Sequence, residues 1–320
     1  MIKGNILLIA IAALVVGAAQ AQSFKPPETR NAALRYWEAF ALMQDQSMEP
    51  GKDLKSLTEI VNGATAWDEQ LSPLVDQNMQ AIQIMQRGTL LPECEWGVDY
   101  SAGSEAPMPQ LAKARALARL NLLYGMRALA RRDNAGAVTA FVAGIRYAQH
   151  LAQDGPIISI LTATTVLRAD FKIIEKAVAS GQLDSQSKAK IYDAVHLLPK
   201  YGFDWAYSVR YEGFAEETAL RQLAASSDPG ALYQSWMGEP LPKAFVLPSV
   251  TDIMELHSYS NDVANAFEMP ADAAQERLNS LKVKLKNASS IVQQVVPNFA
   301  RLNDARKRLE TEREALQQLK

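Results

Sequence analysis

Apolar residues recur at helical spacing along almost the whole chain, and this pattern constrains the fold more than any other feature of the sequence. In residues 30–48, for example, the apolar positions follow i, i+3, i+4, i+7 and i+8, which places them on one face of an α-helix. We find no convincing pair of alternating segments joined by turn residues, as a β-hairpin requires. The sequence therefore predicts an all-α fold, an array of paired antiparallel helices that is repeat-like but irregular.

Capping residues and helix breakers set the expected boundaries. Thr29 and Asp184 are good N-caps, Gly88 suits a helix end, and Pro199 cannot continue a helix. From such signals we expect helices at 30–48, 54–61, 68–85, 111–131, 134–151, 156–179, 184–198 and 204–225, and two or three more after 248, the last at 298–320.

Two irregular segments, 88–109 and 226–248, interrupt the helices because glycine and proline break regular elements. The first segment carries Cys94, Trp96 and the acidic residues Glu93, Glu95, Asp99 and Glu105. A long loop within a compact domain is typically a functional loop or a domain boundary. We expect one all-helical domain over 22–320 that contains both segments.

The first 21 residues have the three parts of a secretory signal peptide. Lys3 provides the positive start, 6–16 is apolar, and 19–21 forms an A-x-A cleavage site. The apolar run is too short for an ordinary transmembrane helix, and no later stretch is long and apolar enough to span a bilayer. We therefore expect cleavage after Ala21 and a periplasmic or secreted protein that begins at Gln22.

Charge and cysteine content limit the possible partners and covalent cross-links of the chain. The chain has 33 basic and 35 acidic side chains, and this near-neutral balance argues against nucleic acid as a partner. Cys94 is the only cysteine, so no internal disulfide can form. We expect this thiol to be buried and inert; an intermolecular disulfide or a reactive thiol is the alternative. The sequence leaves the oligomeric state open.

Residues 121–149 resemble a degenerate tetratricopeptide-type helical hairpin. Gly125 stands where that motif has a glycine for close helix approach, and Asp133 falls in the turn between the helices. The small, aromatic and small positions of the second helix are Ala137, Phe141 and Gly144. The departures from that family are Asn121, Ala128 and Gln149. More broadly, the chain resembles exported all-helical bacterial proteins of uncharacterised activity. These resemblances imply paired helices and export, and they imply no chemistry, cofactor or named partner.

No residue is predicted to be catalytic, to hold a cofactor or to bind a metal. The histidines are far apart in the sequence, at His150, His196 and His257, and neither HExxH nor G-x-S-x-G is present. A catalytic pair of Cys94 with a histidine would have to form in space. Glu93, Glu95 and Asp99 offer oxygens for Ca²⁺ or carboxylates for glycoside cleavage, and a solvated loop is the simpler interpretation.

A basic stripe and an aromatic cluster each have two interpretations. The stripe, on the helix 111–131, consists of Lys113, Arg115, Arg119, Arg127, Arg131 and Arg132. It is either an anion site or a set of ion pairs with neighbouring helices. The aromatic cluster consists of Tyr201, Phe203, Trp205, Tyr207, Tyr211 and Phe214, around Arg210 and Glu212. Its rings either line a groove for carbohydrate or peptide or fill the core.

The last helix carries a narrow leucine seam among charged residues. Leu302, Leu309 and Leu316 are seven residues apart, with Ala305 and Leu319 beside them. Such a seam indicates either a coiled coil between chains or packing on the chain's own body. We expect the second.

Three classes of function remain. The favoured one is an exported helical scaffold or binding protein that presents a groove to a protein or peptide partner. The second is a periplasmic hydrolase that uses carboxylates drawn from Glu93, Glu95, Asp99, Glu212 and Glu216. The third is a carrier that holds an apolar ligand between its helices. Since no catalytic motif is present, an enzymatic role is the less favoured one.

Overall fold

The computed structural model describes residues 29–44, 59, 66–99, 107–153, 155–242 and 245–318. The chain divides into two compact units, Met1–Arg30 and Asn31–Lys320, and all the helices described below belong to the second. The predicted signal peptide lies outside the described residues, and so does the predicted helix 54–61 apart from Glu59.

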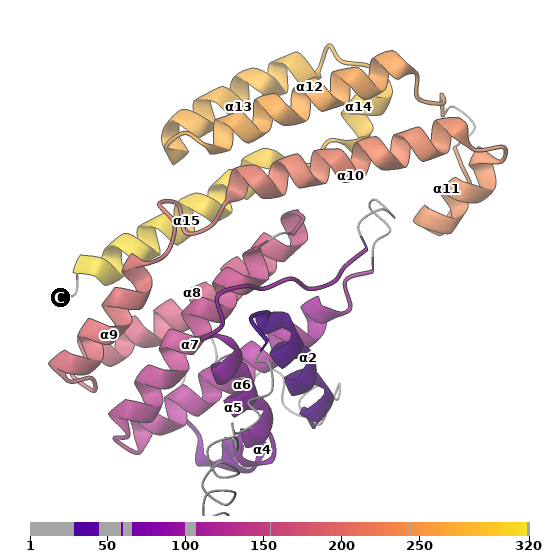
Figure 1. The fold of residues 1–320 in the computed structure, drawn as a ribbon. Coiled ribbons are helices and arrows are strands. Elements are labelled where there is room, and N and C mark those ends of the chain that lie inside the picture. Colours follow the sequence, from indigo (N-terminus) through magenta and orange to yellow (C-terminus); the bar gives the residue numbers. More distant parts are fainter. Residues whose placement is uncertain are drawn as a thin grey trace, which may run out of the picture. The chain divides into compact units, whose positions relative to one another are not determined.

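The described part of the second unit consists of helices and loops without a β-strand, which confirms the all-α prediction (Figure 1). The helices are α2 (Ala32–Leu42), the 3-10 helix η2 (Glu69–Leu71), α4 (Ser72–Gln77), α5 (Met79–Gly88), α6 (Gln110–Ala130), α7 (Asn134–Ala152), α8 (Ile157–Ala179), α9 (Ser185–His196), α10 (Trp205–Ala225), α11 (Pro229–Met237), α12 (Val250–Phe267), α13 (Ala271–Leu285), α14 (Ser290–Val295) and α15 (Phe299–Gln318). Within these described residues, no helix combines the length and apolar character that crossing a bilayer requires.

Aspartate and serine side chains cap the N-termini of several helices. Asp133, Asp184 and Asp204 each accept a hydrogen bond from the backbone N–H three residues ahead, at 2.7–2.9 Å. These bonds satisfy N–H groups that have no partner within the helix. At the start of α12, Ser249 and Asp252 form a capping box. The predicted starts of α7 and α9 are therefore confirmed.

The structure divides the predicted helix 68–85 at Asn78, which is buried. The Asn78 amide nitrogen donates to the carbonyl of Leu74 at 2.9 Å, and its Oδ1 accepts from the backbone N–H of Gln44 at 2.8 Å. Because an asparagine side chain competes with helical backbone bonds, the helix restarts at this point. The bond to Gln44 also explains why α2 ends at Leu42 and does not continue toward 48.

Three further boundaries differ from expectation. Asn31, and not Thr29, caps α2, since its side chain accepts from the N–H of Ala33 at 3.0 Å. The helix α11 forms within 226–248, because Asp228 and Gly238 cap its two ends. After 248, α12, α13, α14 and α15 follow, more helices than expected; α14 is too short to show a helical period.

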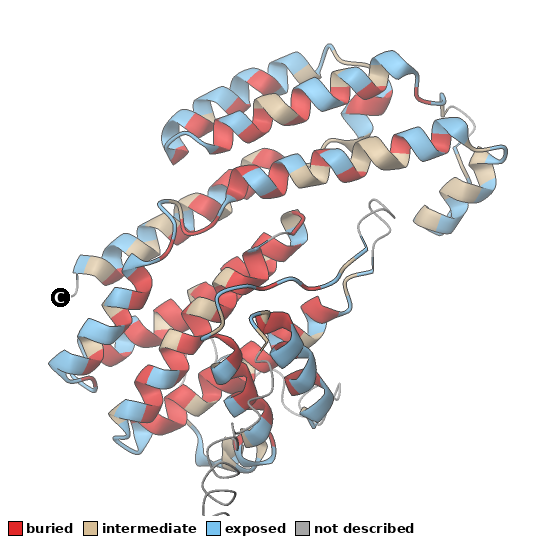
Figure 2. Ribbon diagram, in the orientation of Figure 1, coloured by how far each residue is buried: buried red, intermediate tan, exposed pale blue. Residues whose placement is uncertain are grey.

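The main core lies around α6, α7 and α8, where buried residues cover most of each helix (Figure 2). All three helices contact one another, and α2 packs against α5 beside them. A smaller core lies among α10, α12 and α14, and its buried residues are Leu220, Ile253, Leu256, Ile291 and Val292. The helix α12 pairs with α10 on one side and with α13 on the other.

Glycines allow close approach in the α6–α7–α8 core. A Cβ added at Gly125 would lie 3.0 Å from Cβ of Ala140 and 3.1 Å from the Phe141 ring. A Cβ added at Gly144 would overlap the carboxylate of Asp170 on α8. Both glycines therefore lie at close helix–helix contacts.

The leucine seam of α15 is buried within the chain. Leu302, Leu309 and Leu316 are at most 4% exposed, and α15 contacts α8, α9 and α13. The half-buried Arg168 of α8 donates to Glu312 of α15 through both Nε and Nη2, at 2.5–3.0 Å. The expected packing of this helix on the chain's own body is confirmed.

Candidate binding groove

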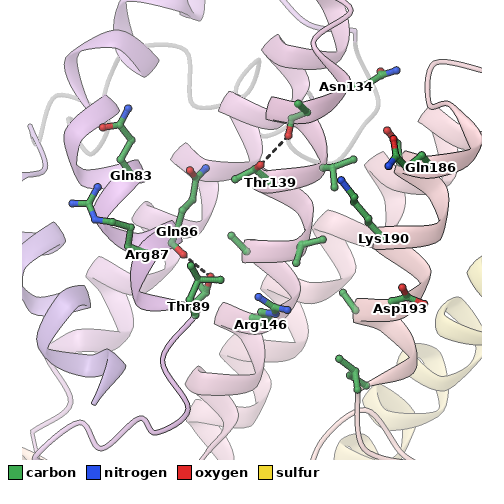
Figure 3. Close-up of a pocket in the computed structure, with 18 of the residues that line it drawn as sticks. Gln83, Gln86, Arg87, Thr89, Asn134, Thr139, Arg146, Gln186, Lys190 and Asp193 are labelled. Carbon is green, nitrogen blue, oxygen red and sulfur yellow. Dashed lines mark hydrogen bonds between the residues drawn. The ribbon is translucent and has the colours of Figure 1, made fainter. Parts of the chain in front are cut away.

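An open groove with a volume of about 880 Å³ lies along α7, between α5 and α9 (Figure 3). We call it the α5–α7–α9 groove. The helix α7 contacts both α5 and α9 and forms the floor. All three helices contribute buried residues to the same core cluster.

The floor follows from the two faces of α7. Phe141 and Ile145 point into the core and are fully buried. Thr139, Val142 and Arg146 lie at helical spacing on another face and line the groove. A helix whose apolar face is packed leaves its polar face for solvent or for a ligand.

The α5 wall presents amide and guanidinium groups. Gln83, Gln86 and Arg87 line it. Gln86 is held in place because its amide nitrogen donates to Oδ1 of Asn121 at 3.0 Å. Asn121 in turn donates to the carbonyl of Ala140 on α7 at 2.8 Å. Asn121, a departure from the tetratricopeptide pattern, thus links the groove wall to the α6–α7 hairpin.

The α9 wall presents both signs of charge. Lys190 and Asp193 line it, and Figure 3 shows both beside the α7 floor. Asp184 closes one end, where it caps α9 and accepts from the amide nitrogen of Asn134 at 3.0 Å. The hydrogen bonds from Ser187 and Asn134 keep the pKa of the Asp184 carboxyl below its usual value. Asp184 therefore has a structural role at this end of the groove.

The groove contains three cations that no described residue pairs with. Within the described residues, the side chains of Arg87, Arg146 and Lys190 have no hydrogen-bond or ion-pair partner, and all three residues line the groove. Leu90 and Leu197 add exposed apolar surface, at 68% and 70% exposure. The chemistry of these groups is that of recognition, since cations and amides bind carboxylates and peptide groups.

The acidic loop lies against the start of α2. The amide nitrogen of Asn31 donates to the carbonyl of Glu95 at 2.9 Å, and the N–H of Ala32 donates to the carbonyl of Glu93 at 2.7 Å. The side chains of Glu93 and Glu95 are exposed, and Glu105 lies outside the described residues. Within the described part of the chain, no three histidine, cysteine or acidic side chains are placed to hold a metal ion.

The other predicted carboxylates lie on α10. Glu212 accepts from the backbone N–H of Ile157, in the first turn of α8, at 3.1 Å. Burial and the neighbouring Glu212 raise the pKa of Glu216 to about 9. The α5–α7–α9 groove is lined by neither of them, nor by Glu93, Glu95 or Asp99.

Cys94 and His150 belong to a buried aromatic cluster. The Tyr36 hydroxyl lies 2.5 Å from Nδ1 of His150, and Trp96 Nε1 donates to the His150 carbonyl at 3.1 Å. Burial, with a smaller contribution from Arg146, lowers the pKa of His150 to about 4. Cys94 is 1% exposed, as expected of an inert thiol. This cluster fastens α2 and the segment after α5 to α7.

The remaining histidines lie apart. His257, on α12, is exposed, and its Nδ1 lies 3.0 Å from Glu217 of α10. His196 is the last residue of α9 and is exposed.

Four arginines of the basic stripe form two pairs with different surroundings. Arg127 forms an ion pair with Asp76 at 2.5 Å, and Arg131 forms one with Glu69 at 3.1 Å. This pair therefore follows the ion-pairing interpretation. Arg115 and Arg119 instead border a small cavity between α6 and α8.

The aromatic cluster divides in the same way. Phe203 and Trp205 are buried, and Trp205 Nε1 donates to the carbonyl of Tyr201 at 2.8 Å, which supports the core interpretation for these rings. Tyr207 and Phe214 are 41% and 55% exposed. None of these rings lines the α5–α7–α9 groove.

Comparison with known proteins found no match: no family model, no curated protein and no solved structure is similar to this chain. The candidate site therefore rests on its own geometry.

Sequence reasoning did not identify the groove residues. A signal was present on α9, where Gln186, Lys190 and Asp193 lie at helical spacing on one polar face. A polar face alone, however, is typical of any surface helix. Only the packing of α5 and α9 on either side of α7 turns three such faces into one groove.

Proposed function

We propose that this protein is an exported scaffold or binding protein whose α5–α7–α9 groove holds a segment of a protein or peptide partner. The observation that carries the proposal is the set of cations, Arg87, Arg146 and Lys190, that have no ion-pair partner among the described residues and line one open groove of about 880 Å³. Binding pockets commonly have volumes of about 300–1,000 Å³. A groove of this size admits a ligand much larger than one side chain.

The lining indicates the chemistry of the bound segment. Arginine and lysine favour carboxylates, so the segment carries aspartate, glutamate or a free C-terminus. The amides of Gln83 and Gln186 can both donate and accept, which suits the polar groups of a peptide backbone. Leu90 and Leu197 provide apolar surface for the segment's own apolar side chains.

Export is part of the proposal. Residues 1–21 carry the charge, the apolar run and the cleavage site of a signal peptide. The partner is then a periplasmic or extracellular protein, and nucleic acid is not expected there. The intact mass of protein recovered outside the cytoplasm tests this step, because it should correspond to a chain that begins at Gln22.

Selection of peptides tests the groove itself. We expect a displayed library of random peptides, selected against the protein, to be enriched in acidic residues. The double variant Arg146→Gln, Lys190→Gln should raise the Kd of a selected peptide by about tenfold or more, since each lost charged hydrogen bond contributes about 1.5–3 kcal/mol. Titration calorimetry measures the change.

Two further variants make this test specific. Thr139→Trp places a large ring on the exposed floor and should block binding, because Thr139 is exposed and makes only an intrahelical bond to Ala135. Lys282→Gln removes a cation from the exposed surface of α13 and should leave the Kd unchanged. If peptides bind the Thr139→Trp variant as tightly as the parent, the groove is not the binding site.

A further inference from the structure

Arg115, Arg119 and Asp170 border a small cavity between α6 and α8, with a volume of about 90 Å³. None of its lining residues belongs to the α5–α7–α9 groove. The helix α6 supplies both arginines and α8 supplies the aspartate, while Leu122 and Val166 provide apolar walls. The cavity therefore combines cations, one carboxyl group and an apolar surface.

The carboxyl group of Asp170 is buried, and no described residue pairs with it to offset the cost of burial. Asp170 is 3% exposed, and its Oδ1 has no hydrogen-bond partner among the described residues. Within that part of the chain, neither Arg115 nor Arg119 forms an ion pair with it. A buried carboxyl group without a partner is destabilising and calls for an explanation. Burial raises the pKa of Asp170 well above its usual value, which favours the protonated form of the group, the form that can donate a hydrogen bond.

Gly144 makes room for this carboxyl group. It lies in the middle of α7, where glycine is less stable than alanine by about 1 kcal/mol. Both carboxyl oxygens of Asp170 lie within 3 Å of the place where a Cβ of Gly144 would be. A helix-interior glycine and an unpaired buried acid, each unfavourable alone, thus meet at one point beside the cavity.

Arg115 and Arg119 are unfavourable neighbours as well. They are four residues apart on α6, and like charges at this spacing repel. Burial and the charge of Arg115 lower the pKa of Arg119. Neither has an ion-pair partner among the described residues, whereas Arg127 and Arg131 of the same stripe do. An anion at the cavity would remove this repulsion.

We propose that this cavity binds a short-chain carboxylate that carries a second hydrogen-bonding group, with the carboxylate on Arg115 and Arg119 and the second group on Asp170. Guanidinium groups match carboxylates in charge and geometry. The apolar walls of Leu122 and Val166 suit a short carbon chain better than inorganic phosphate. The volume of about 90 Å³ limits the ligand to a small molecule.

Titration with three matched anions tests the proposal. Lactate has both groups, propionate lacks the second polar group, and inorganic phosphate lacks the carbon chain. We expect saturable shifts of the Arg119 and Asp170 amide signals in NMR spectra with lactate at millimolar concentration, and weaker binding of the other two anions. Equal affinity for lactate and propionate, tighter binding of phosphate, or the absence of saturable shifts with lactate would overturn the proposal.

Variants assign the two ends of the ligand. Arg119→Gln should weaken the binding of both lactate and propionate by about tenfold, which is the effect of losing one charged hydrogen bond. Asp170→Ala should leave propionate binding in place and remove the preference for lactate, and Asp170→Asn, which can still hydrogen-bond, should retain that preference. Arg131→Gln, at the C-cap of the same helix and paired with Glu69, is the matched control and should leave both affinities unchanged. If Arg119→Gln binds lactate as the parent does, the arginines do not hold the carboxylate.

Discussion

The guanidinium carbon of Arg306 lies 3.9 Å from the centre of the Tyr201 ring, and the Arg306 side chain is completely buried. Its nitrogens donate to the carbonyls of Phe267 and Met269 at the end of α12, at 2.8 and 2.5 Å. A third bond, at 2.7 Å, joins its Nε to Glu310. One buried cation therefore connects α15, the end of α12 and the segment before α10.

Arg306→Met should destabilise the protein by about 3 kcal/mol or more. The substitution leaves the buried carbonyl of Phe267, the part-buried bond partner Met269 and the partly buried Glu310 without their donor, and unpaired buried polar groups cost about 1–3 kcal/mol each. Urea unfolding followed by circular dichroism measures the loss. Arg308→Met is the matched control, because Arg308 is exposed and bonds only the carbonyl of Asp304 on its own helix. Equal stability of the two variants would show that the buried contacts of Arg306 contribute little.

The contribution of His150 to stability should depend on pH. Its pKa falls from 6.5 in the unfolded chain to about 4 in the folded protein, mainly because of burial. Only the neutral ring fits the folded state, so the contribution is fully present above pH 6.5 and is lost as the pH falls toward 4. The difference corresponds to about 3 kcal/mol.

Unfolding at several pH values measures this contribution by comparison with His150→Gln. The variant cannot gain a proton at this position, so the stability difference between parent and variant should shrink between pH 7 and pH 4. A difference that stays constant over this range would mean that His150 does not titrate on unfolding. His257→Gln, at an exposed ring, is the control for the procedure.

The sequence predicted most helices correctly, but it did not predict which residues contact each other across different helices. The helix starts at Asp133, Asp184 and Asp204 can be predicted from the local sequence, since a capping side chain bonds the backbone of the next turn. Asn78 carries no such signal, because the bond that helps to stop α2 comes from a residue 34 positions away. The breaks at Asn78 and Leu42 could be explained only after the two helices were placed together.

The same limit applies to the candidate sites. Spacing on α6 groups Arg115 with Arg119 and Arg127 with Arg131, and it makes the two pairs look alike. The structure separates them because Asp76 and Glu69 lie beside the second pair, whereas the first borders a cavity. Partners on other helices, which the sequence does not place, decide which charged residues remain available for a ligand.

Gly144→Ala should destabilise the protein by about 1–3 kcal/mol, the usual effect of overpacking a core. Its methyl group would overlap the carboxyl group of Asp170. The effect should largely disappear in the background of Asp170→Ala, which removes that carboxyl group. Thermal unfolding of the two single variants and the double variant gives the coupling. Additive effects would show that the new methyl group strains something other than Asp170.

The contribution of α15 to the fold depends on Leu309, in the middle of its leucine seam. Leu309 is fully buried and lies against Gly202, where an added Cβ would be 2.8 Å from its Cδ2. Leu309→Ala should therefore destabilise the protein by about 2–5 kcal/mol, the usual range for a buried leucine. Because the seam packs within one chain, this loss should be the same at every protein concentration. Val283→Ala, at a side chain that is 61% exposed on α13, should have almost no effect. If the loss of stability instead fades as the protein is diluted, and sedimentation shows a parent dimer that the variant cannot form, then the seam joins two chains.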